Sequence, residues 1–250
     1  MDKLIDILQL CLARLSPHDV CMLRCTCSEL HDEEQLEVSW QGHSIDFKLD
    51  GSASATSWLQ MNIHSMNKLS VSISFSVPRQ VLQDVMEGGR NLTCLTINSQ
   101  HVEELPALPP QLQQLDLKRC SQLHVLPALP PTLRQLSCGE CRALEALPSS
   151  LSTTAATKLS CSRCCCLKSL PQLPPSLVEL QAFECTSLAQ LPALPGGLER
   201  LDISNCKALS ELLKLPASLA YLSCSGCSLL RKLPQLAHTG LSWTAAAVIC

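Results

Sequence analysis

The sequence predicts an α/β solenoid in which short parallel strands stack side by side along most of the chain. Three observations favour this architecture. A leucine motif recurs about every 21 residues from residue 92 onward, a cysteine follows it at a nearly constant distance, and prolines crowd the segments between motifs. Fourteen of the sixteen prolines lie between Pro106 and Pro234, so these return segments cannot be regular α-helices.

The recurring unit begins with a Leu-x-x-Leu motif, with alanine in the first position of one unit. The motif predicts a short strand whose leucines point into the solenoid, because alternate side chains of a strand face opposite sides. The return segment, as in Leu126–Pro131, is expected to be extended or 3-10. The ninth residue is expected to turn the chain and donate to loop carbonyls, and it is cysteine in six units: Cys120, Cys141, Cys164, Cys185, Cys206 and Cys227.

The unit LxxLxLxxCxxLxxLPxLPxx resembles the leucine-rich-repeat family, in the short proline-backed form of plant immune receptors and bacterial effectors. The resemblance implies a leucine-rich-repeat solenoid with a parallel β-sheet on its concave face and a mostly extended or 3-10 convex side. These repeats would occupy residues 92–250. The unit at Leu151–Leu170 carries two extra residues and is expected to bulge on the convex side. The last unit stops at Cys250 without a polar cap, which indicates a longer natural protein or a shortened gene model.

Residues 43–91 are interpreted as a linker and longer N-terminal repeats with helical backs. The alternation of Leu69–Phe75 predicts a strand, and Pro78–Met86 predicts a helix that ends at Gly88–Gly89. The next strand is expected over Leu92–Ile97. An earlier unit of the same kind is expected with its strand, loop and helix at 45–49, 51–56 and 58–66.

Residues 1–42 carry apolar side chains three and four apart, which predicts two amphipathic helices. Ser16–Asp19 supplies an N-cap serine, a proline in the first turn and an acidic residue for the second helix. The stretch RLSPHDVCMLRCTCSEL resembles the F-box family, although the family's opening Leu-Pro is absent at Lys3–Leu4. A plain helical cap on the solenoid is the alternative. The F-box resemblance implies binding to a Skp-type adaptor through Leu8, Leu12, Leu15, Pro17, Val20 and Leu23.

The third, fifth and seventh residues of each unit are expected to point out from the concave face toward a protein partner. Shorter residues in these positions, such as Ser162 and Ser223, are expected to face outward as well. Phe183, Arg200 and Tyr221 are expected to form one anchor cluster, because interface hot spots favour aromatic residues and arginine. The alternative is that these are ordinary solvated side chains. The expected partner-binding residues are Gln114, Asp116, Lys118, Gln135, Lys158, Glu179, Gln181, Phe183, Arg200, Asp202 and Tyr221.

The cysteines also suggest a metal site, because three CxxC pairs occur, at residues 138/141, 161/164 and 224/227. Zinc usually takes four ligands in a tetrahedral arrangement, whereas repeat positions six and nine would stack thiols in rows. We therefore expect no metal and no cofactor. The seven histidines match no catalytic motif and no phosphate-binding glycine loop is present, so an enzyme is not expected.

Charge and hydropathy restrict the partners further. The net charge of −3 leaves no basic surface, so nucleic acid is not an expected partner. No apolar run is long enough to cross a bilayer, and Asp2 and Asp6 argue against a secretory signal. Nothing indicates an oxidising compartment, so the seventeen cysteines are expected to be reduced thiols in the cytoplasm or nucleus.

Together these patterns predict a protein–protein interaction module. By the F-box resemblance it would be the substrate receptor of an SCF-type E3 ubiquitin ligase, joined to the cullin complex through the adaptor and holding an unknown protein substrate on the concave face. The alternative is a leucine-rich-repeat binding or immune-sensor scaffold without a link to a ubiquitin ligase.

Overall fold

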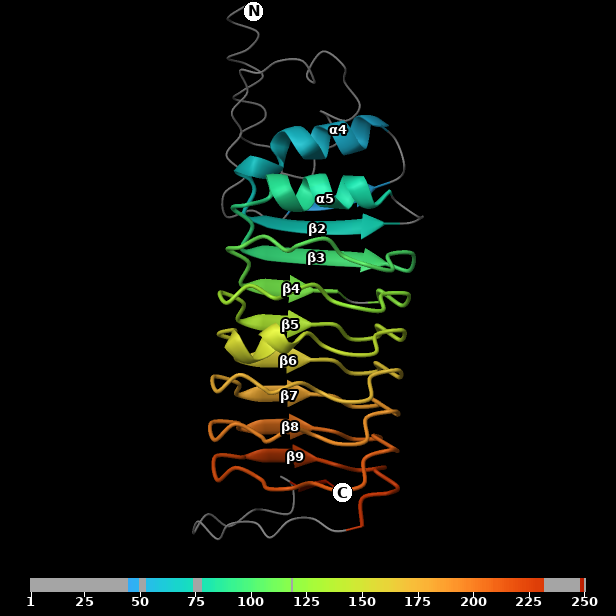
Figure 1. Ribbon diagram of the computed structural model, residues 1–250, viewed down its shortest axis with the longest axis vertical. Coiled ribbons are helices and arrows are strands. Elements are labelled where there is room, and N and C mark those ends of the chain that lie inside the picture. The colour runs from blue at the N-terminus through green and yellow to red at the C-terminus, as the bar shows by residue number, and fades with distance from the viewer. Residues whose placement is uncertain (1–44, 50–52, 74–77, 118, 232–247, 250) are drawn as a thin grey trace, which may run out of the picture.

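The computed structural model describes residues 45–49, 53–73, 78–117, 119–231 and 248–249. Within these ranges, ten strands form one parallel sheet in strict sequence order, from β1 (Ile45–Leu49) to β10 (Val248–Ile249). Each strand therefore pairs with the strands of the units just before and after it. Figure 1 shows the strands stacked along the long axis of the molecule. The predicted parallel solenoid is confirmed.

The N-terminal units of this stack have longer strands and helical backs. The strands are β2 (Lys68–Ile73) and β3 (Cys94–Ser99), and the helices are α4 (Ala53–Asn62), the 3-10 turn η1 (Ile63–Ser65) and α5 (Arg79–Gly88). Helix α5 confirms the helix predicted after Pro78, and its buried face carries Leu82, Val85 and Met86. Helices α4 and α5 contact one another at the N-terminal end of the stack (Figure 1).

The expected boundary between loop and helix in the first unit was wrong. Helix α4 begins at Ala53, inside the segment expected to be a loop, and its end is the 3-10 turn over Ile63–Ser65. The run of Ala, Ser and Thr at the start of α4 has weak turn chemistry and no apolar periodicity of its own. Helix α4 packs against α5, and this tertiary contact stabilises a helix that the local sequence does not predict.

The later strands are three residues long: β4 (Gln114–Asp116), β5 (Gln135–Ser137), β6 (Lys158–Ser160), β7 (Glu179–Gln181), β8 (Arg200–Asp202) and β9 (Tyr221–Ser223). The middle residue of each is leucine, and these leucines lie in register from one strand to the next. Where the structure describes them, the proline-rich return segments have no helix except η2 (Ser149–Thr153). This 3-10 turn accommodates the two extra residues of the longer unit, so the insertion lies in the return segment as predicted.

The core is one continuous cluster of leucine, cysteine and other apolar side chains from Leu59 to Cys224. In three units, the residue just before the Leu-x-x-Leu motif is a serine or threonine whose hydroxyl donates a hydrogen bond to the backbone of the preceding unit. Thr132, Ser176 and Ser218 donate to the carbonyl oxygens of Leu112, Ala156 and Leu198, at 2.8, 2.9 and 2.7 Å. These bonds satisfy backbone acceptors that the short strands leave unpaired. They explain the recurring Ser or Thr ahead of the motif.

Two predictions fall on residues that the structure does not describe. The F-box-like helices, including all six expected adaptor-binding residues, lie within residues 1–44. Lys118 is also outside the described residues. In the described part of the chain, no helix is both long enough and apolar enough to span a membrane.

Candidate functional site

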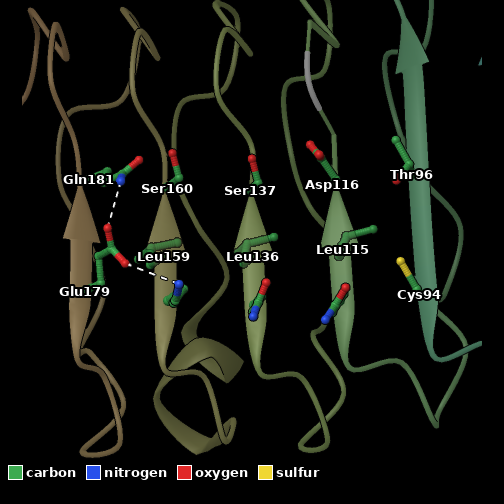
Figure 2. A pocket seen from close by; sticks show the side chains of 13 residues that line it. Cys94, Thr96, Leu115, Asp116, Leu136, Ser137, Leu159, Ser160, Glu179 and Gln181 are labelled. Atoms are coloured by element: carbon green, nitrogen blue, oxygen red, sulfur yellow. Dashed lines mark hydrogen bonds and ion pairs between the residues drawn. The ribbon is translucent and has the colours of Figure 1, made fainter.

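The candidate site is the outward face of strands β3–β9, which we call the sheet face and which corresponds to the expected concave surface. The first and third residues of each short strand are exposed or partly exposed on it, except the buried Ser223 of β9, while the middle leucine is buried. Figure 2 shows the outward side chains in two rows with the strand leucines between them. They line a shallow depression of about 310 Å³ that runs from β3 to β7.

Glu179 lies at the β7 end of the depression, and its side chain is 19% exposed. Gln181 Nε2 donates a hydrogen bond of 2.9 Å to Glu179 Oε1. Lys158 Nζ lies 3.6 Å from Glu179 Oε2, and Arg200 Nε lies 3.9 Å from Glu179 Oε1. Figure 2 draws the contacts of Glu179 with Gln181 and Lys158. Because β6, β7 and β8 are neighbours, three units hold this carboxylate between two cations. The structure thus brings together four of the expected partner-binding residues.

Two arginine side chains stack on aromatic rings of the following unit. The Arg200 guanidinium lies 5.0 Å from the Tyr221 ring centre, and the Arg163 guanidinium lies 5.6 Å from the Phe183 ring centre. Such contacts contribute about 0.5–1 kcal/mol at exposed sites and hold both side chains in one orientation. The expected anchors are therefore ordered, but each aromatic has its own arginine.

The single anchor cluster expected from Phe183, Arg200 and Tyr221 is separated in the structure. Arg200 and Tyr221 occupy the first position of adjacent strands, in register. Phe183 lies past the end of β7, four residues beyond Glu179, which is the residue of β7 in register with Arg200. Four residues span about 13 Å along a strand. The sheet face therefore carries two arginine–aromatic pairs at opposite ends of the strands.

Two serines expected to point outward are buried instead. Ser162 is 5% exposed and Ser223 is 6% exposed. Ser162 occupies the same repeat position as Phe183 of the next unit, and its side chain is much shorter. Alternation along a strand predicts direction, but exposure also depends on the size of the neighbours across the strands.

A row of left-handed residues just past the strands was missed from the sequence. Five residues other than glycine have φ between 58° and 64°, and Gly226 follows with φ 74°. Left-handed backbone is rare for residues other than glycine, so this turn is imposed by the stack. The signal was present as a charged or small residue immediately before each ninth-position cysteine. The five residues are Arg119, Glu140, Arg163, Glu184 and Asn205.

The charges in this row alternate in sign and form ion pairs between units. Arg163 Nε lies 3.1 Å from Glu184 Oε2, and Arg163 Nη1 lies 3.4 Å from Glu140 Oε1. Arg119 Nε lies 3.6 Å from Glu140 Oε2. These side chains are partly exposed, so each pair contributes little, but together they connect four consecutive units along one edge of the sheet face.

We expect Arg163→Glu to lower the free energy of unfolding by about 0.5–1 kcal/mol at low salt, because the new carboxylate would lie between Glu140 and Glu184. Screening by salt should reduce this loss. Urea unfolding at low and high salt measures both. Arg134→Glu, an equal charge reversal at an exposed position, is the control. A loss that is the same at both salt concentrations would contradict the ion-pair row.

The ninth-position cysteines form a hydrogen-bonded ladder behind the sheet. The Sγ atom of each donates to the sixth-position carbonyl oxygen of the preceding unit, at 3.0 Å for Cys185, Cys206 and Cys227 and 3.1 Å for Cys141 and Cys164. The same contact from Cys120 is 3.5 Å. The expected role of this cysteine as a turn donor is confirmed, and its acceptor is now identified.

The surroundings of these thiols shift their pKa values in different directions: a side-chain hydrogen bond with a neighbouring cysteine lowers the pKa of Cys120 and of Cys185. Burial raises the pKa of the Cys206 thiol to about 12 and also raises the pKa of Cys227. Within the described residues, no group of three or more His, Cys, Asp or Glu could hold a metal ion. Cys224 is disulfide-bonded in the structure, which departs from the expectation that every cysteine is a reduced thiol.

Comparisons with known proteins give a distant structural match. No family model matches the chain, and no curated protein matches it. Among solved structures, it is similar to a leucine-rich repeat protein from Eubacterium ventriosum ATCC 27560, with 22% sequence identity and a TM-score of 0.41. The match covers 70% of this chain but only 46% of that one. The strands, leucines and return segments described above establish the fold. The chain folds as a solenoid of stacked parallel strands with buried leucines.

Proposed function

We propose that this protein is a protein-interaction module that binds a partner protein on the sheet face. The observation that carries the proposal is the continuous outward face of β3–β9, on which ordered side chains from consecutive units lie in register. Stacked repeats produce extended surfaces of this kind, and repeat proteins use them for binding. The opposite side of the sheet is filled by leucine and cysteine side chains and offers no such surface.

The pair Arg200–Tyr221 and the carboxylate of Glu179 are proposed as the main contact region. Arginine and tyrosine are enriched among residues that dominate binding energy, particularly where they are held in place before the partner arrives. Here the Tyr221 ring and the Glu179 carboxylate hold the Arg200 side chain from two sides. Arg163–Phe183 forms the second proposed contact at the other end of the strands.

The contact region predicts a binding experiment. Cross-linking mass spectrometry would identify the partner and its contact sites, and titration calorimetry would then measure affinity. We expect Arg200→Ala and Tyr221→Ala each to weaken binding about 30-fold, which corresponds to about 2 kcal/mol.

Lys214→Ala on a return segment is the matched control, because Lys214 is exposed on the other side of the solenoid. It should bind as tightly as the unmodified chain. The unfolding midpoint of each variant separates lost contacts from lost folding. If both sheet-face variants keep full affinity, the partner binds elsewhere.

For the biological role, we propose a substrate receptor of an SCF-type ubiquitin ligase, on the basis of the F-box resemblance. Residues 1–42 would bind a Skp-type adaptor and through it the cullin complex, while the sheet face holds the substrate. The receptor would perform no chemistry and need no cofactor; it would raise the effective concentration of substrate beside the ligase in the cytoplasm or nucleus. A binding or immune-sensor scaffold without the ligase is the alternative.

A pull-down of the full chain with a purified Skp-type adaptor tests this role. We expect the unmodified chain and Arg200→Ala to retain the adaptor, and Leu12→Glu to lose it, because a charge cannot be buried in an apolar helix interface without a partner. If the folded chain does not bind the adaptor, the ligase role is wrong and the scaffold remains. Deleting residues 1–40 also separates the two, since a scaffold would keep its partner and its biological effect.

A further inference from the structure

The cysteine triplet 164–166 is divided by the fold into one buried and two exposed thiols. Cys164 is buried and donates to the Cys138 carbonyl oxygen at 3.1 Å, as a member of the ladder. Cys165 and Cys166 are exposed free thiols. They are the only exposed free cysteines among the residues that the structure describes. The ladder therefore accounts for the first cysteine and leaves the other two without a structural role.

Both exposed thiols occupy the outer corner of a tight turn. Leu167 N donates to the Cys164 carbonyl oxygen at 3.2 Å, which closes a four-residue turn with Cys165 and Cys166 at its two central positions. The peptide bond between them is trans, so their Cα atoms are about 3.8 Å apart. The Cys165 Sγ has one weak contact, 3.6 Å from the Arg163 carbonyl oxygen.

The same turn in other units shows that it does not require cysteine. The corresponding turn bond is 3.1 Å in the units that begin their turns at Cys120, Cys141, Cys185 and Cys206. The two central residues of those turns contain no cysteine: Ser121–Gln122, Arg142–Ala143, Thr186–Ser187 and Lys207–Ala208. Two adjacent thiols at this corner are thus a property of one unit alone.

We propose that Cys165 and Cys166 form a two-thiol site for a soft, thiophilic trivalent centre, of which a monosubstituted arsenical is the simplest example. Two thiols condense with the arsenical oxide: both S–H bonds and the arsenic–oxygen bonds break, two As–S bonds form, and one water leaves. Arsenic remains trivalent and no electrons are transferred. After the first As–S bond, the second thiol reacts within the same molecule, so its effective concentration is high. Buried ladder thiols cannot compete, because they are inaccessible.

Phenylarsine oxide tests this site on the full, reduced chain. Native labelling with N-ethylmaleimide, followed by unfolding and labelling with iodoacetamide, distinguishes exposed from buried thiols at each position. Trypsin cleaves after Arg163 and Lys168 and releases residues 164–168 as one peptide. We expect two maleimide groups and one iodoacetamide group on this peptide. Prior addition of phenylarsine oxide should block both maleimide groups, and a small dithiol should restore them. The peptide 159–163, with buried Cys161, should carry only iodoacetamide.

Single substitutions separate a two-thiol site from two independent thiols. Cys165→Ser and Cys166→Ser should each weaken protection of the remaining thiol at least tenfold, whereas Cys94→Ser should leave protection unchanged. Equal unfolding midpoints would show that the fold is intact. The proposal is overturned if the peptide takes up any number of maleimide groups other than two, or if either single variant is protected at the same arsenical concentration as the unmodified chain.

Discussion

We expect Leu180→Ala to lower the free energy of unfolding by about 2–5 kcal/mol, the range for leucine truncation at fully buried sites. Leu180 is the central residue of β7 and has no exposed surface. It lies in register between Leu159 and Leu201, so its side chain contacts the cores of two neighbouring units. The cavity would weaken both interfaces at the middle of the stack, where stability comes from contacts between nearest neighbours.

Urea unfolding followed by circular dichroism measures this loss as a lower midpoint. Gln135→Ala is a matched control, because Gln135 is an exposed side chain on β5 and its removal should change stability by less than about 0.5 kcal/mol. A weakened interface can also separate the array into two halves, which would appear as a broader or two-step transition. If Leu180→Ala and Gln135→Ala unfold at the same midpoint, the register of the central leucines is incorrect.

The second large effect is expected at alkaline pH. The Cys206 thiol has no exposed surface and its pKa is raised by burial to about 12, whereas an unfolded cysteine ionises near 8.5. Between these values the unfolded chain has released the proton and the folded chain still holds it. The stabilising contribution of this thiol is therefore complete below about pH 8.5 and is lost as pH rises toward 12, by up to about 1.4 kcal/mol per pH unit.

Urea unfolding at pH 7.5, 9 and 10.5 tests the expectation. For this one thiol, the free energy of unfolding should fall by about 2 kcal/mol between pH 9 and 10.5. Cys206→Ser keeps a donor for the Ala182 carbonyl oxygen but does not ionise in this range. Over the same pH interval, the free energy of unfolding of this variant should therefore fall by about 2 kcal/mol less than that of the unmodified chain. Lysine and tyrosine titrations are common to both proteins and cancel in the difference. Equal pH dependence of the two proteins would show that Cys206 does not hold its proton.

The features predicted from sequence were those that repeat. The Leu-x-x-Leu motif located the strands, the ninth-position cysteine located the turn donor, and the prolines excluded helices from the return segments. Helix α5 was also predicted, because Pro78 and Gly89 mark its two ends. Each of these signals depends on local backbone chemistry or on a period that the chain shows many times.

Features that depend on contacts between units were missed or wrong. The left-handed residues before the cysteines, the separation of Phe183 from Arg200, and the burial of Ser162 all involve neighbours about 21 residues away. The start of α4 depends on packing against α5 in the same way. A repeat pattern shows that units are equivalent, but it does not show which side chains of adjacent units contact one another.

Amino-acid order alone was enough to establish a solenoid of parallel strands with leucines inside and polar side chains on one face, because the period and the hydrophobic pattern leave few other folds. The tertiary structure decided the arrangement of the sheet face: Glu179 held between Lys158 and Arg200, and two separate arginine–aromatic pairs. These contacts exist only after stacking brings residues of consecutive units within a few ångströms. The sequence of one unit cannot specify these contacts, because they depend on how its strand is aligned with the strand of the next unit.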